Sequence, residues 1–443
     1  MTDQKSTSDD RIHPLQSGER RLARFLQAAV VVGLVGLLVT DLAGDGEGAA
    51  PSGQEVTVDT TTPSTAPPST SPPPTTPPPT DGAPTSEAPT PGASATLAPR
   101  PARSFTLVAT GDIISHGAVA DRAATAAEGT GSGWDFTPLF GRVRPILAGA
   151  DLALCHLESP LSRHDDDLSF RGTFRVPSTL ADAIADAGYD GCSLASNHSL
   201  DSGPSSVTAT LHHLHRVGLA TTGMAEAADA AGPAWYEPGG IRVAHLSVTD
   251  LLNGRDLPMD PPWMVPHLDV DRVVADARAA RYAGAEFVVV SVHWGEEYRA
   301  DPTDRQRTAG RRLLAAPEVD LVLGHHAHVV QPVERLDGDA LAYGLGNFLT
   351  NQPGDAANPC RSCPPETQDG LIAWFQVRAD DGGAAIVDAG YVPTWVDREH
   401  NHQVVPIGVD DPDHLDPEAL AASAARTAAV VEPSLRRLEL TAG

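Results

Sequence analysis

The stretch LVLGHHAHVV, residues 321–330, does most to decide the fold class and the kind of site. It starts as a short apolar run typical of a buried strand and continues with His325, His326 and His328. Histidines gathered at the end of a buried strand would compete for hydrogen bonds and repel one another when protonated, so they have little structural use without a cation. The stretch therefore predicts a metal-binding segment where a strand ends.

Further strand-like runs lie on both sides of this stretch and alternate with helical patterns. The apolar, β-branched runs occupy residues 105–110, 151–158, 191–196, 242–248, 286–294, 319–326, 340–348 and 371–377. Helical spacing of apolar residues occurs at 178–187, 205–217, 270–283 and 303–315. Such alternation predicts crossover units and a largely parallel, buried sheet. Runs after about residue 329 lack intervening helices, so we expect an antiparallel edge or a second sheet, which would make a β-sandwich with helices outside.

Side chains of metal-binding types recur at the carboxyl ends of five of these strands, where ligands bind in α/β sheets. They are Asp112, His156 with Glu158, Asn197 with His198 and Asp201, His293, and the histidines of 325–328. Each has a plain interpretation when taken alone, such as a turn for Asp112, a solvated loop for Glu158 or a satisfied core histidine for His293. Their recurrence at one end of five strands favours a shared metal site.

Mixed oxygen and nitrogen ligands suit one or two divalent ions, Mn, Zn or Fe, better than calcium. Two such ions can make hydroxide available at neutral pH and stabilise charge on an attacked phosphoryl or carbonyl oxygen. His198 follows Asn197 directly, so it is the predicted general acid or oxyanion-stabilising cation. Asp201 would hold the tautomer of His198 or, alternatively, have a turn or N-cap role before the helix expected at 205–217.

The acidic composition limits the partners. The chain has a formal net charge of -27, and residues 104–443 alone carry 47 acidic and 24 basic side chains. A nucleic-acid-binding protein needs a basic surface to neutralise phosphates, so DNA and RNA are excluded as partners.

The four cysteines fit an oxidising compartment. Cys360 and Cys363 lie in a Pro-rich loop, which favours a small loop disulfide over a redox centre. Cys155 and Cys192 lie in apolar strand-like runs, where free buried thiols are expected, although pairing between them depends on which strands are neighbours.

An export signal precedes the folded part. Arg20, Arg21 and Arg24 come before the apolar run 25–40, and no good small-x-small cleavage site follows it. The run is somewhat shorter than a comfortable span of about 20 residues. An uncleaved anchor is nevertheless favoured over a removed signal, with a twin-arginine signal as a weaker alternative. The arginines place the first residues in the cytoplasm and everything after the span outside the cell membrane.

Residues 51–103 hold 15 of the 39 prolines and 12 threonines, which cannot bury enough apolar surface to order the chain. The predicted organisation is a cytoplasmic tail at 1–24, a single-pass transmembrane signal-anchor at 25–43, a disordered Pro/Thr-rich linker at 44–103, an α/β domain at 104–400, and one or two peripheral helices within 401–443.

Six motifs, in this order, resemble the CapA family of capsule and poly-γ-glutamate synthesis proteins. They are ATGDIISHG at 109–117, DLALCHLESPL at 151–161, SLASNHSLDSG at 193–203, SVHWGEEY at 291–298, LGHHAHVVQP at 323–332 and YGLGNF at 343–348. The resemblance covers about residues 104–395. Departures from the family pattern are His156 and Ser196, where the family usually has asparagine, and Ala327, where it usually has proline.

The resemblance implies a calcineurin-like metallophosphoesterase fold, a two-layer β-sandwich flanked by helices. It implies catalytic His198 and the metal ligands Asp112, Glu158, Asn197, His293, His326 and His328. His326 and His328 are preferred to His325 because alternate residues of an extended segment point the same way. The roles of His325, His116 and His156 stay open.

Two functions follow as alternatives. The first is a membrane-anchored, extracytoplasmic metal-dependent hydrolase that acts on a cell-envelope polymer or phosphoester. The second is a non-catalytic polymer-binding accessory subunit of a membrane synthesis and export complex. The negative charge disfavours an anionic polymer except where metals and arginines locally reverse the field.

Overall fold

The computed structural model describes residues 102–254, 263–354 and 360–440. The predicted tail and anchor, residues 1–24 and 25–43, lie outside the described residues, as does the predicted linker up to residue 101. No helix among the described residues is long and apolar enough to cross a membrane. The anchor and the linker therefore remain predictions.

The larger of two sheets is built around its long central strand β1. Its order is β16–β15–β14–β1–β2–β5–β6, with β13 paired to the end of β1 and β17 paired to β15. β1, β2, β5 and β6 are parallel, whereas β14 and β15 continue the sheet antiparallel on the other side of β1. The strands are β1 (Arg103–Ile113), β2 (Leu152–Leu157), β5 (Gly191–Ser193), β6 (Ala220–Thr222), β13 (Asn347–Leu349), β14 (Asp369–Asp380), β15 (Gly383–Asp397), β16 (Gln403–Pro406) and β17 (Arg436–Arg437).

The smaller sheet has the order β11–β12–β10–β9–β8–β7. Its four inner strands β12, β10, β9 and β8 are parallel, and the edge strands β11 and β7 run antiparallel to their neighbours. The strands are β7 (Ala234–Tyr236), β8 (Val243–Thr249), β9 (Phe287–His293), β10 (Leu321–His325), β11 (Val333–Leu336) and β12 (Asp339–Ala342).

The two sheets pack face to face through their apolar sides. Alternate residues of β1, such as Phe105 and Leu107, meet residues of the smaller sheet, and the Phe105 ring packs edge-on against Phe287 with centroids 6.0 Å apart. The outer face of β1 carries Val108, which packs against the helices instead. This alternation along one strand gives a β-sandwich with one core between the sheets and one on each outer side.

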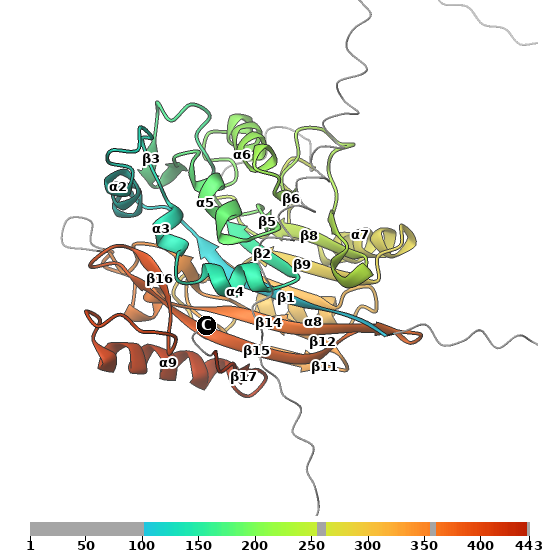
Figure 1. The fold of residues 1–443 in the computed structure, drawn as a ribbon. Helices are drawn as coiled ribbons and strands as arrows, with labels where there is room; N and C mark the ends of the chain where they lie inside the picture. The colour runs from blue at the N-terminus through green and yellow to red at the C-terminus, as the bar shows by residue number, and fades with distance from the viewer. Residues whose placement is uncertain (1–101, 255–262, 355–359, 441–443) are drawn as a thin grey trace, which may run out of the picture. The chain divides into compact units, whose positions relative to one another are not determined.

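Helices cover both outer faces of the sandwich (Figure 1). The helices on the larger sheet are α2 (Gly117–Ala126), α3 (Thr137–Phe140), α4 (Arg144–Gly149), α5 (Leu180–Ala187) and α6 (Pro204–Arg216). Those on the smaller sheet are α7 (Val270–Tyr282) and α8 (Asp304–Leu314). The remaining elements are the hairpin β3 (Ser169–Arg171) and β4 (Thr173–Arg175), the 3-10 turns η1 (Pro238–Gly240) and η2 (Pro365–Gln368), and helix α9 (Pro417–Val431), drawn in red in Figure 1.

Capping side chains start the later helices close to the predicted positions. The Asp269 carboxylate accepts hydrogen bonds from the backbone at the start of α7. At α8, Thr303 and Gln306 form a reciprocal capping box. These contacts satisfy the otherwise unpaired amides of the first turn and so fix where each helix begins. The starts predicted from helical periodicity, residues 270 and 303, lie within one residue of the starts of α7 and α8.

The mixed α/β sandwich with outer helices is confirmed, but one of the strands predicted late in the chain is divided between the two sheets. The run 340–348 is not one strand: β12 joins the smaller sheet and β13 pairs with β1 in the larger one. The chain bends between them at Gly346, which has φ 70° and whose Cβ, if present, would come within 2.7 Å of the Asp369 carbonyl oxygen. The antiparallel pair β14–β15 extends the larger sheet next to β1.

The part after residue 400 contributes two short strands as well as a helix. β16 and β17 both pair with β15, and a single helix, α9, lies between them in the chain. Val431 at the end of α9 and Leu435 belong to the core between the sheets. The division of the chain at residue 400 remains a prediction.

Both cysteine pairs form disulfides. Cys360 is bonded to Cys363, as expected for the Pro-rich loop. Cys155 is bonded to Cys192, so the expectation of free buried thiols at these positions is wrong. The reason is the sheet order, because β2 and β5 are parallel neighbours and place Cys155 directly opposite Cys192.

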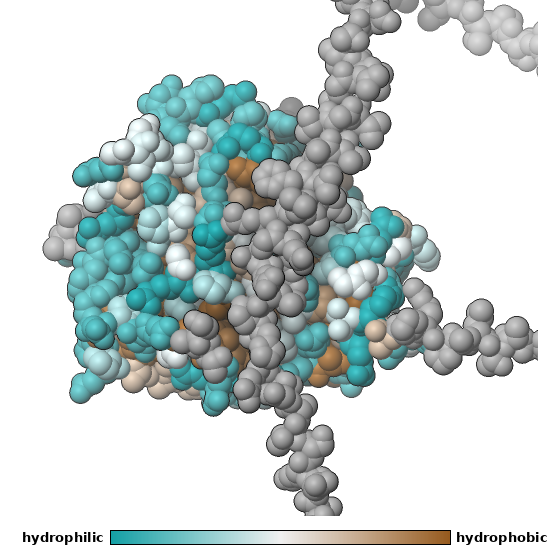
Figure 2. All heavy atoms as spheres, in the orientation of Figure 1, coloured by the Kyte–Doolittle hydropathy of each residue, from teal (hydrophilic) through white to brown (hydrophobic). Residues whose placement is uncertain are grey.

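The surface agrees with the acidic composition. Hydrophilic residues cover most of the face shown in Figure 2. The exposed large apolar side chains among the described residues are Trp235, Tyr282, Leu336 and Val387, which come from four different elements.

Candidate metal centre

Parallel strands of both sheets bring their carboxyl ends to one place. Asp112 and His156 lie opposite each other near the ends of β1 and β2, and His293 and His325 lie opposite each other at the ends of β9 and β10. All four side chains are buried. The predicted convergence of strand ends is therefore present in the described chain, and it draws on two sheets.

Asp112, His156 and His325 form the first of two ligand clusters, which we call cluster 1. One ligand atom from each lies within 4.8 Å of the others. His325 Nδ1 is hydrogen-bonded to Asp112 Oδ1 at 2.9 Å, and the His156 ring stacks on the His325 ring with centroids 4.0 Å apart. His156, whose role the sequence left open, therefore belongs to the same cluster as Asp112.

Glu158, His326 and His328 form cluster 2, again with one ligand atom each within 4.8 Å of the others. The Glu158 carboxylate is fully buried, and neither of its oxygens has a hydrogen-bond partner among the described residues. Its nearest charged neighbour there is His328, with Nε2 3.7 Å from Oε1. His326 Nδ1 is also buried without a partner among these residues. A buried carboxylate without hydrogen bonds is costly, and a bound cation would compensate this cost.

The two clusters are joined through the second carboxylate oxygen of Asp112. Asp112 Oδ2 accepts a hydrogen bond from the His326 backbone N–H at 3.0 Å and lies 3.4 Å from His328 Nδ1. The clusters are therefore adjacent and share one carboxylate, an arrangement that accommodates one or two ions. The donor set of imidazoles and carboxylates fits Mn, Zn or Fe.

The histidine segment itself is bent. His326 and His328 have positive φ angles of 88° and 57°. The reason given for preferring this pair, that alternate residues of an extended segment share a face, is therefore wrong. The bend places His325 in cluster 1, while His326 and His328 both belong to cluster 2.

Asn197 and His293 lie beside cluster 1 and contact each other. Asn197 Oδ1 is hydrogen-bonded to His293 Nε2 at 3.0 Å, and His293 Nδ1 to His156 Nε2 at 3.0 Å. The Asn197 side-chain amide donates to Asn253 Oδ1 at 3.3 Å. Their ligand roles remain predictions: His293 contacts His156 of cluster 1, and Asn197 contacts His293.

His198 and Asp201 form a hydrogen-bonded pair at the edge of cluster 2. His198 Nδ1 is 2.7 Å from Asp201 Oδ2, which also accepts the Phe174 backbone N–H at 2.6 Å. His198 Nε2 lies 4.0 Å from Glu158 Oε1. The carboxylate thus favours the tautomer with the proton on Nδ1 and leaves Nε2 facing cluster 2.

Of the two alternatives for Asp201, the N-cap role is wrong and the position in a turn before the helix is confirmed. The residue at the N-cap of α6 is Gly203, and no side chain caps this helix. Asp201 instead lies in the turn before α6, where its carboxylate is buried against His198 and the backbone of β4.

Burial sets the charge state of most of the candidate ligands. Burial raises the pKa of Glu158 to about 7 against the opposing effect of His328. Burial and nearby His328 lower the pKa of His326 to about 3. Burial and neighbouring histidines hold the pKa values of His156 and His293 well below their usual range. These three imidazoles are therefore neutral, which is the form that ligates metals.

His328 and Asp112 are exceptions because they interact with opposite charges. Burial would lower the pKa of His328, but Glu158 and Asp112 together raise it to about 10. Burial would raise the pKa of Asp112, but hydrogen bonds with His325 and His328 hold it well below its usual range. The His328 imidazolium thus supplies positive charge between two carboxylates.

Asn347 is a site residue that the sequence did not single out. It starts β13 opposite Asp112, and its Oδ1 is hydrogen-bonded to His328 Nδ1 at 3.0 Å. Its side-chain amide donates to the His328 carbonyl, Gln352 Oε1 and the Thr367 carbonyl, which fixes its orientation. The signal was the motif YGLGNF, whose asparagine directly precedes a buried apolar pair.

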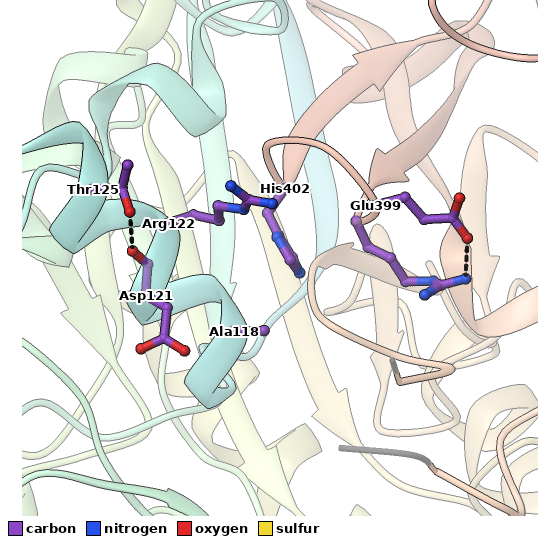
Figure 3. A pocket seen from close by; sticks show the side chains of 7 residues that line it. Ala118, Asp121, Arg122, Thr125, Glu399 and His402 are labelled. Carbon is purple, nitrogen blue, oxygen red and sulfur yellow. Dashed lines mark hydrogen bonds and ion pairs between the residues drawn. The ribbon is translucent and has the colours of Figure 1, made fainter. Parts of the chain in front are cut away.

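A hollow of about 490 Å³ opens beside the centre, between α2 and the turn from β15 to β16 (Figure 3). Figure 3 shows Arg122 of α2 extending toward His402 of that turn. His402 Nε2 is hydrogen-bonded to Asn351 Oδ1 at 2.8 Å, and the Asn351 backbone N–H donates to His116 Nδ1 at 3.3 Å. The hollow is lined by Ala118, Asp121, Arg122, Thr125, Arg398, Glu399 and His402.

His116 links the hollow to the candidate general acid. It is the N-cap residue of α2, and burial with nearby histidines lowers its pKa to about 3. The His116 ring packs edge-on against Phe174, centroids 5.6 Å apart, and Phe174 packs edge-on against His198, centroids 4.7 Å apart. His402, which lines the hollow, is therefore connected to His198 through Asn351, His116 and Phe174.

Two packed sheets with a buried cluster of histidines and carboxylates at their strand ends define an α/β protein with a candidate divalent-metal centre. The family model described as "Bacterial capsule synthesis protein PGA_cap" matches residues 106–352. This is more than half of the chain, so the chain belongs to this family. The resemblance to CapA proteins predicted from the six motifs is confirmed.

Curated relatives match at moderate identity. The chain is 28% identical over 228 residues to the PGA biosynthesis protein CapA of Bacillus subtilis, covering 48% of this chain and 57% of that one. It is 26% identical over 264 residues to the capsule biosynthesis protein CapA of Bacillus anthracis, covering 56% and 60%. A probable polyglutamine synthesis accessory protein of Mycobacterium tuberculosis is 27% identical over 178 residues, covering 37% and 46%. The matches thus span less than two thirds of each relative.

Solved structures match only loosely. The calcineurin-like phosphoesterase YfkN from Bacillus subtilis has a TM-score of 0.37 and 12% identity, covering 74% of this chain and 97% of that chain. A 5'-nucleotidase precursor from Thermus thermophilus has a TM-score of 0.36 and 19% identity, covering 74% and 58%. Similarity at this level is too low to support an inference, so the fold class rests on the two sheets themselves.

Proposed function

We propose that this protein is a metal-dependent hydrolase of the phosphoesterase type that acts on a cell-envelope polymer or phosphoester during capsule or poly-γ-glutamate synthesis. The observation that carries the proposal is the Glu158 carboxylate, which is fully buried beside His328 and His198 and has no hydrogen bond among the described residues. Membership of the capsule synthesis family supports the biological context.

The two clusters have complementary parts in this proposal. Cluster 1 and cluster 2 would each hold one divalent ion, with Asp112 between them and with Asn197 and His293 as further ligands. The bound ions, Mn, Zn or Fe, would supply Lewis-acid polarisation of a phosphoryl or carbonyl oxygen.

The chain's own residues would handle the proton. The Asp201 carboxylate keeps the His198 proton on Nδ1, and a second proton on Nε2 would make an imidazolium that faces cluster 2. His198 would then donate the Nε2 proton to the leaving-group oxygen as that bond breaks. The Phe174 ring, packed edge-on against His198, would hold the imidazole in this orientation.

The test uses the full chain purified in detergent and loaded with Mn²⁺. We expect hydrolysis of bis-p-nitrophenyl phosphate or shortening of a γ-glutamyl polymer, and we expect H198A to lose both while retaining its bound metal. The exposed α6 histidine variant H212A is the matched control. Equal turnover by H198A and the unaltered chain would contradict the proposed proton donor, and no turnover by any form would favour the second function below.

The second candidate function is a polymer-binding accessory subunit without turnover. The hollow beside the centre favours it, because Arg122 and Arg398 bring two guanidinium groups to a strongly acidic domain. Arg398 donates to Glu399 and to the Gly354 carbonyl, whereas Arg122 forms no ion pair with another described residue. Because Arg398 is paired with Glu399, Arg122 is the guanidinium that would attract a carboxylate polymer locally.

Binding and cleavage separate the two functions. Sedimentation of labelled poly-γ-glutamate with the full chain should be weakened by R122E but not by R272E, an exposed arginine of α7. Polymer that binds and is recovered at full length after incubation with Mn²⁺ would establish the accessory role. Polymer that is shortened would establish the hydrolase.

We also propose that residues 25–43 anchor the protein in the cell membrane, with the α/β domain outside it. The supporting observation is the run of apolar residues behind three arginines. Deletion of residues 25–43 should move the protein out of the membrane fraction, and protease added to intact spheroplasts should digest the domain of the unaltered chain. Release of a shortened chain without detergent would show a cleaved signal instead.

A further inference from the structure

A third histidine and carboxylate cluster lies outside the candidate metal centre. Asp397 is the last residue of β15, His400 lies in the turn that leads to β16, and His414 lies in the loop before α9. One ligand atom of each lies within 4.8 Å of the others. The three residues therefore bring together two separate segments at the edge of the larger sheet.

Both imidazoles point at one buried carboxylate. His400 Nδ1 lies 2.8 Å from Asp397 Oδ1, and His414 Nε2 lies 2.8 Å from Asp397 Oδ2. The two rings pack edge-on with centroids 4.4 Å apart. The Asp397 side chain is 1% exposed, whereas those of His400 and His414 are 49% and 43% exposed. The carboxylate is thus buried, and the half-exposed imidazoles are the members of the cluster that solvent reaches.

The backbone holds this arrangement in place. The Asp397 carbonyl accepts hydrogen bonds from the backbone N–H groups of Asn401 and His402, at 3.2 and 2.7 Å. Asp411 Oδ1 accepts the Gly408 N–H at 2.8 Å, which orders the loop that carries His414. The ligand atoms are therefore positioned by the fold, so little conformational entropy would be lost on binding an ion.

We propose that Asp397, His400 and His414 bind a divalent transition metal ion such as Zn²⁺, with water completing the coordination. Two imidazoles and one carboxylate with an open side are a donor set typical of zinc. Each imidazole would ligate through the ring nitrogen that faces Asp397, Nδ1 of His400 and Nε2 of His414, and would carry its proton on the other ring nitrogen.

The bound ion would fasten the loop before α9 to the turn between β15 and β16. The other side of this turn carries Arg398, Glu399 and His402, which line the hollow next to the candidate metal centre. An ion at this third site would therefore stiffen one wall of the hollow without contacting cluster 1 or cluster 2. The third site does not depend on the proposed hydrolase or accessory function.

The test counts zinc equivalents on the full chain in detergent after chelation and dialysis. We expect the double variant H400A/H414A to bind one Zn²⁺ fewer than the unaltered chain in equilibrium dialysis with elemental analysis. The double variant H212A/H267A removes two exposed histidines elsewhere and should bind the same number as the unaltered chain. Equal stoichiometry in H400A/H414A and the unaltered chain would overturn the proposal.

Hydrogen exchange gives a second, local measurement. Zn²⁺ should slow amide exchange in residues 408–416 of the unaltered chain and leave exchange in H400A/H414A unchanged. The isosteric variant D397N should also lose the effect, and the histidine variants decide the matter if D397N fails to fold. Slowing of exchange in 408–416 that persists in H400A/H414A would place the zinc elsewhere and overturn the assignment.

Discussion

The buried candidate metal centre and the proposed third site at the end of β15 use the same kinds of side chain but leave their carboxylates in different states. In cluster 2, neither Glu158 oxygen has a hydrogen bond among the described residues, and the side chain is fully buried. At the third site, each Asp397 oxygen is hydrogen-bonded to one histidine at 2.8 Å. The comparison indicates that a bound cation would satisfy polar groups left without hydrogen bonds at the first site, whereas the carboxylate of the second site is already hydrogen-bonded without one.

The largest expected effect comes from removing the unsatisfied carboxylate. E158Q should reduce hydrolysis to background and abolish binding of one Mn²⁺ equivalent, because a neutral amide gives no charge compensation to the ion. Added Mn²⁺ should raise the Tm of the unaltered chain by more than it raises the Tm of E158Q. Calorimetry with and without Mn²⁺ measures both.

The control for this change is E334Q, which alters a partly exposed carboxylate of β11 paired with Arg311. It should keep the metal content and the Mn²⁺-dependent Tm of the unaltered chain. Full metal occupancy in E158Q would contradict this prediction, because it would show that the buried Glu158 carboxylate is not needed to bind the cation.

The second prediction separates two kinds of residue within the buried centre, those that would bind metal and those that would transfer a proton. H198A should lower turnover by about 10²–10⁴-fold, the usual contribution of a general acid. D201N should lower it less and should add little to H198A, because Asp201 acts through His198. Steady-state kinetics with measured metal content checks both, and a large loss of metal in H198A would make it a ligand instead.

Much of the buried centre could be predicted because its residues lie at strand ends. Asp112, Glu158 and His293 lie at the ends of apolar runs, and parallel strands bring their carboxyl ends to one edge of a sheet. Predicting that these residues converge therefore did not require knowing which strands are neighbours. The same reasoning placed Asn197 and His198 together at the end of the run 191–196. Local sequence and the rule for strand ends were enough for these residues.

What could not be predicted depends on contacts between distant segments. The bonding of Cys155 to Cys192 follows from the neighbouring positions of β2 and β5, and no local pattern indicates sheet order. The bend at His326 and His328 arises from positive φ angles at residues that rarely adopt them. The third site escaped notice because Asp397, His400 and His414 are individually ordinary and lie on both sides of a strand.

A third prediction concerns the support beneath the buried centre, which the exposed site lacks. The Cys155–Cys192 disulfide joins β2 to β5 one residue before His156 and encloses a sequence separation of 37 residues. C155A/C192A should lower the free energy of unfolding by about 2–4 kcal/mol, since the cross-link restricts the unfolded chain. Denaturant unfolding measures this, with C360A/C363A as the comparison.

The second cysteine pair makes the comparison informative. Cys360 and Cys363 are only three positions apart, so their bond restricts the unfolded chain much less, and C360A/C363A should cost less stability. Equal losses in both double variants would mean that restriction of the unfolded chain does not govern either bond. A loss confined to metal affinity in C155A/C192A would instead show that this disulfide positions His156.

The smallest effect is expected at the exposed site in the absence of metal. H400A/H414A should lower the free energy of unfolding of the chelated protein by about 1–3 kcal/mol, because it leaves the buried Asp397 carboxylate with fewer hydrogen bonds. The histidines are half exposed, so water can reach the gap and limit the loss. Micromolar Zn²⁺ should then stabilise the unaltered chain and not the variant, which denaturant unfolding with buffered zinc measures. Identical unfolding curves for chelated H400A/H414A and the unaltered chain would show that the hydrogen bonds from these histidines to Asp397 do not stabilise the fold. The carboxylate of the third site would then not be the satisfied counterpart of Glu158.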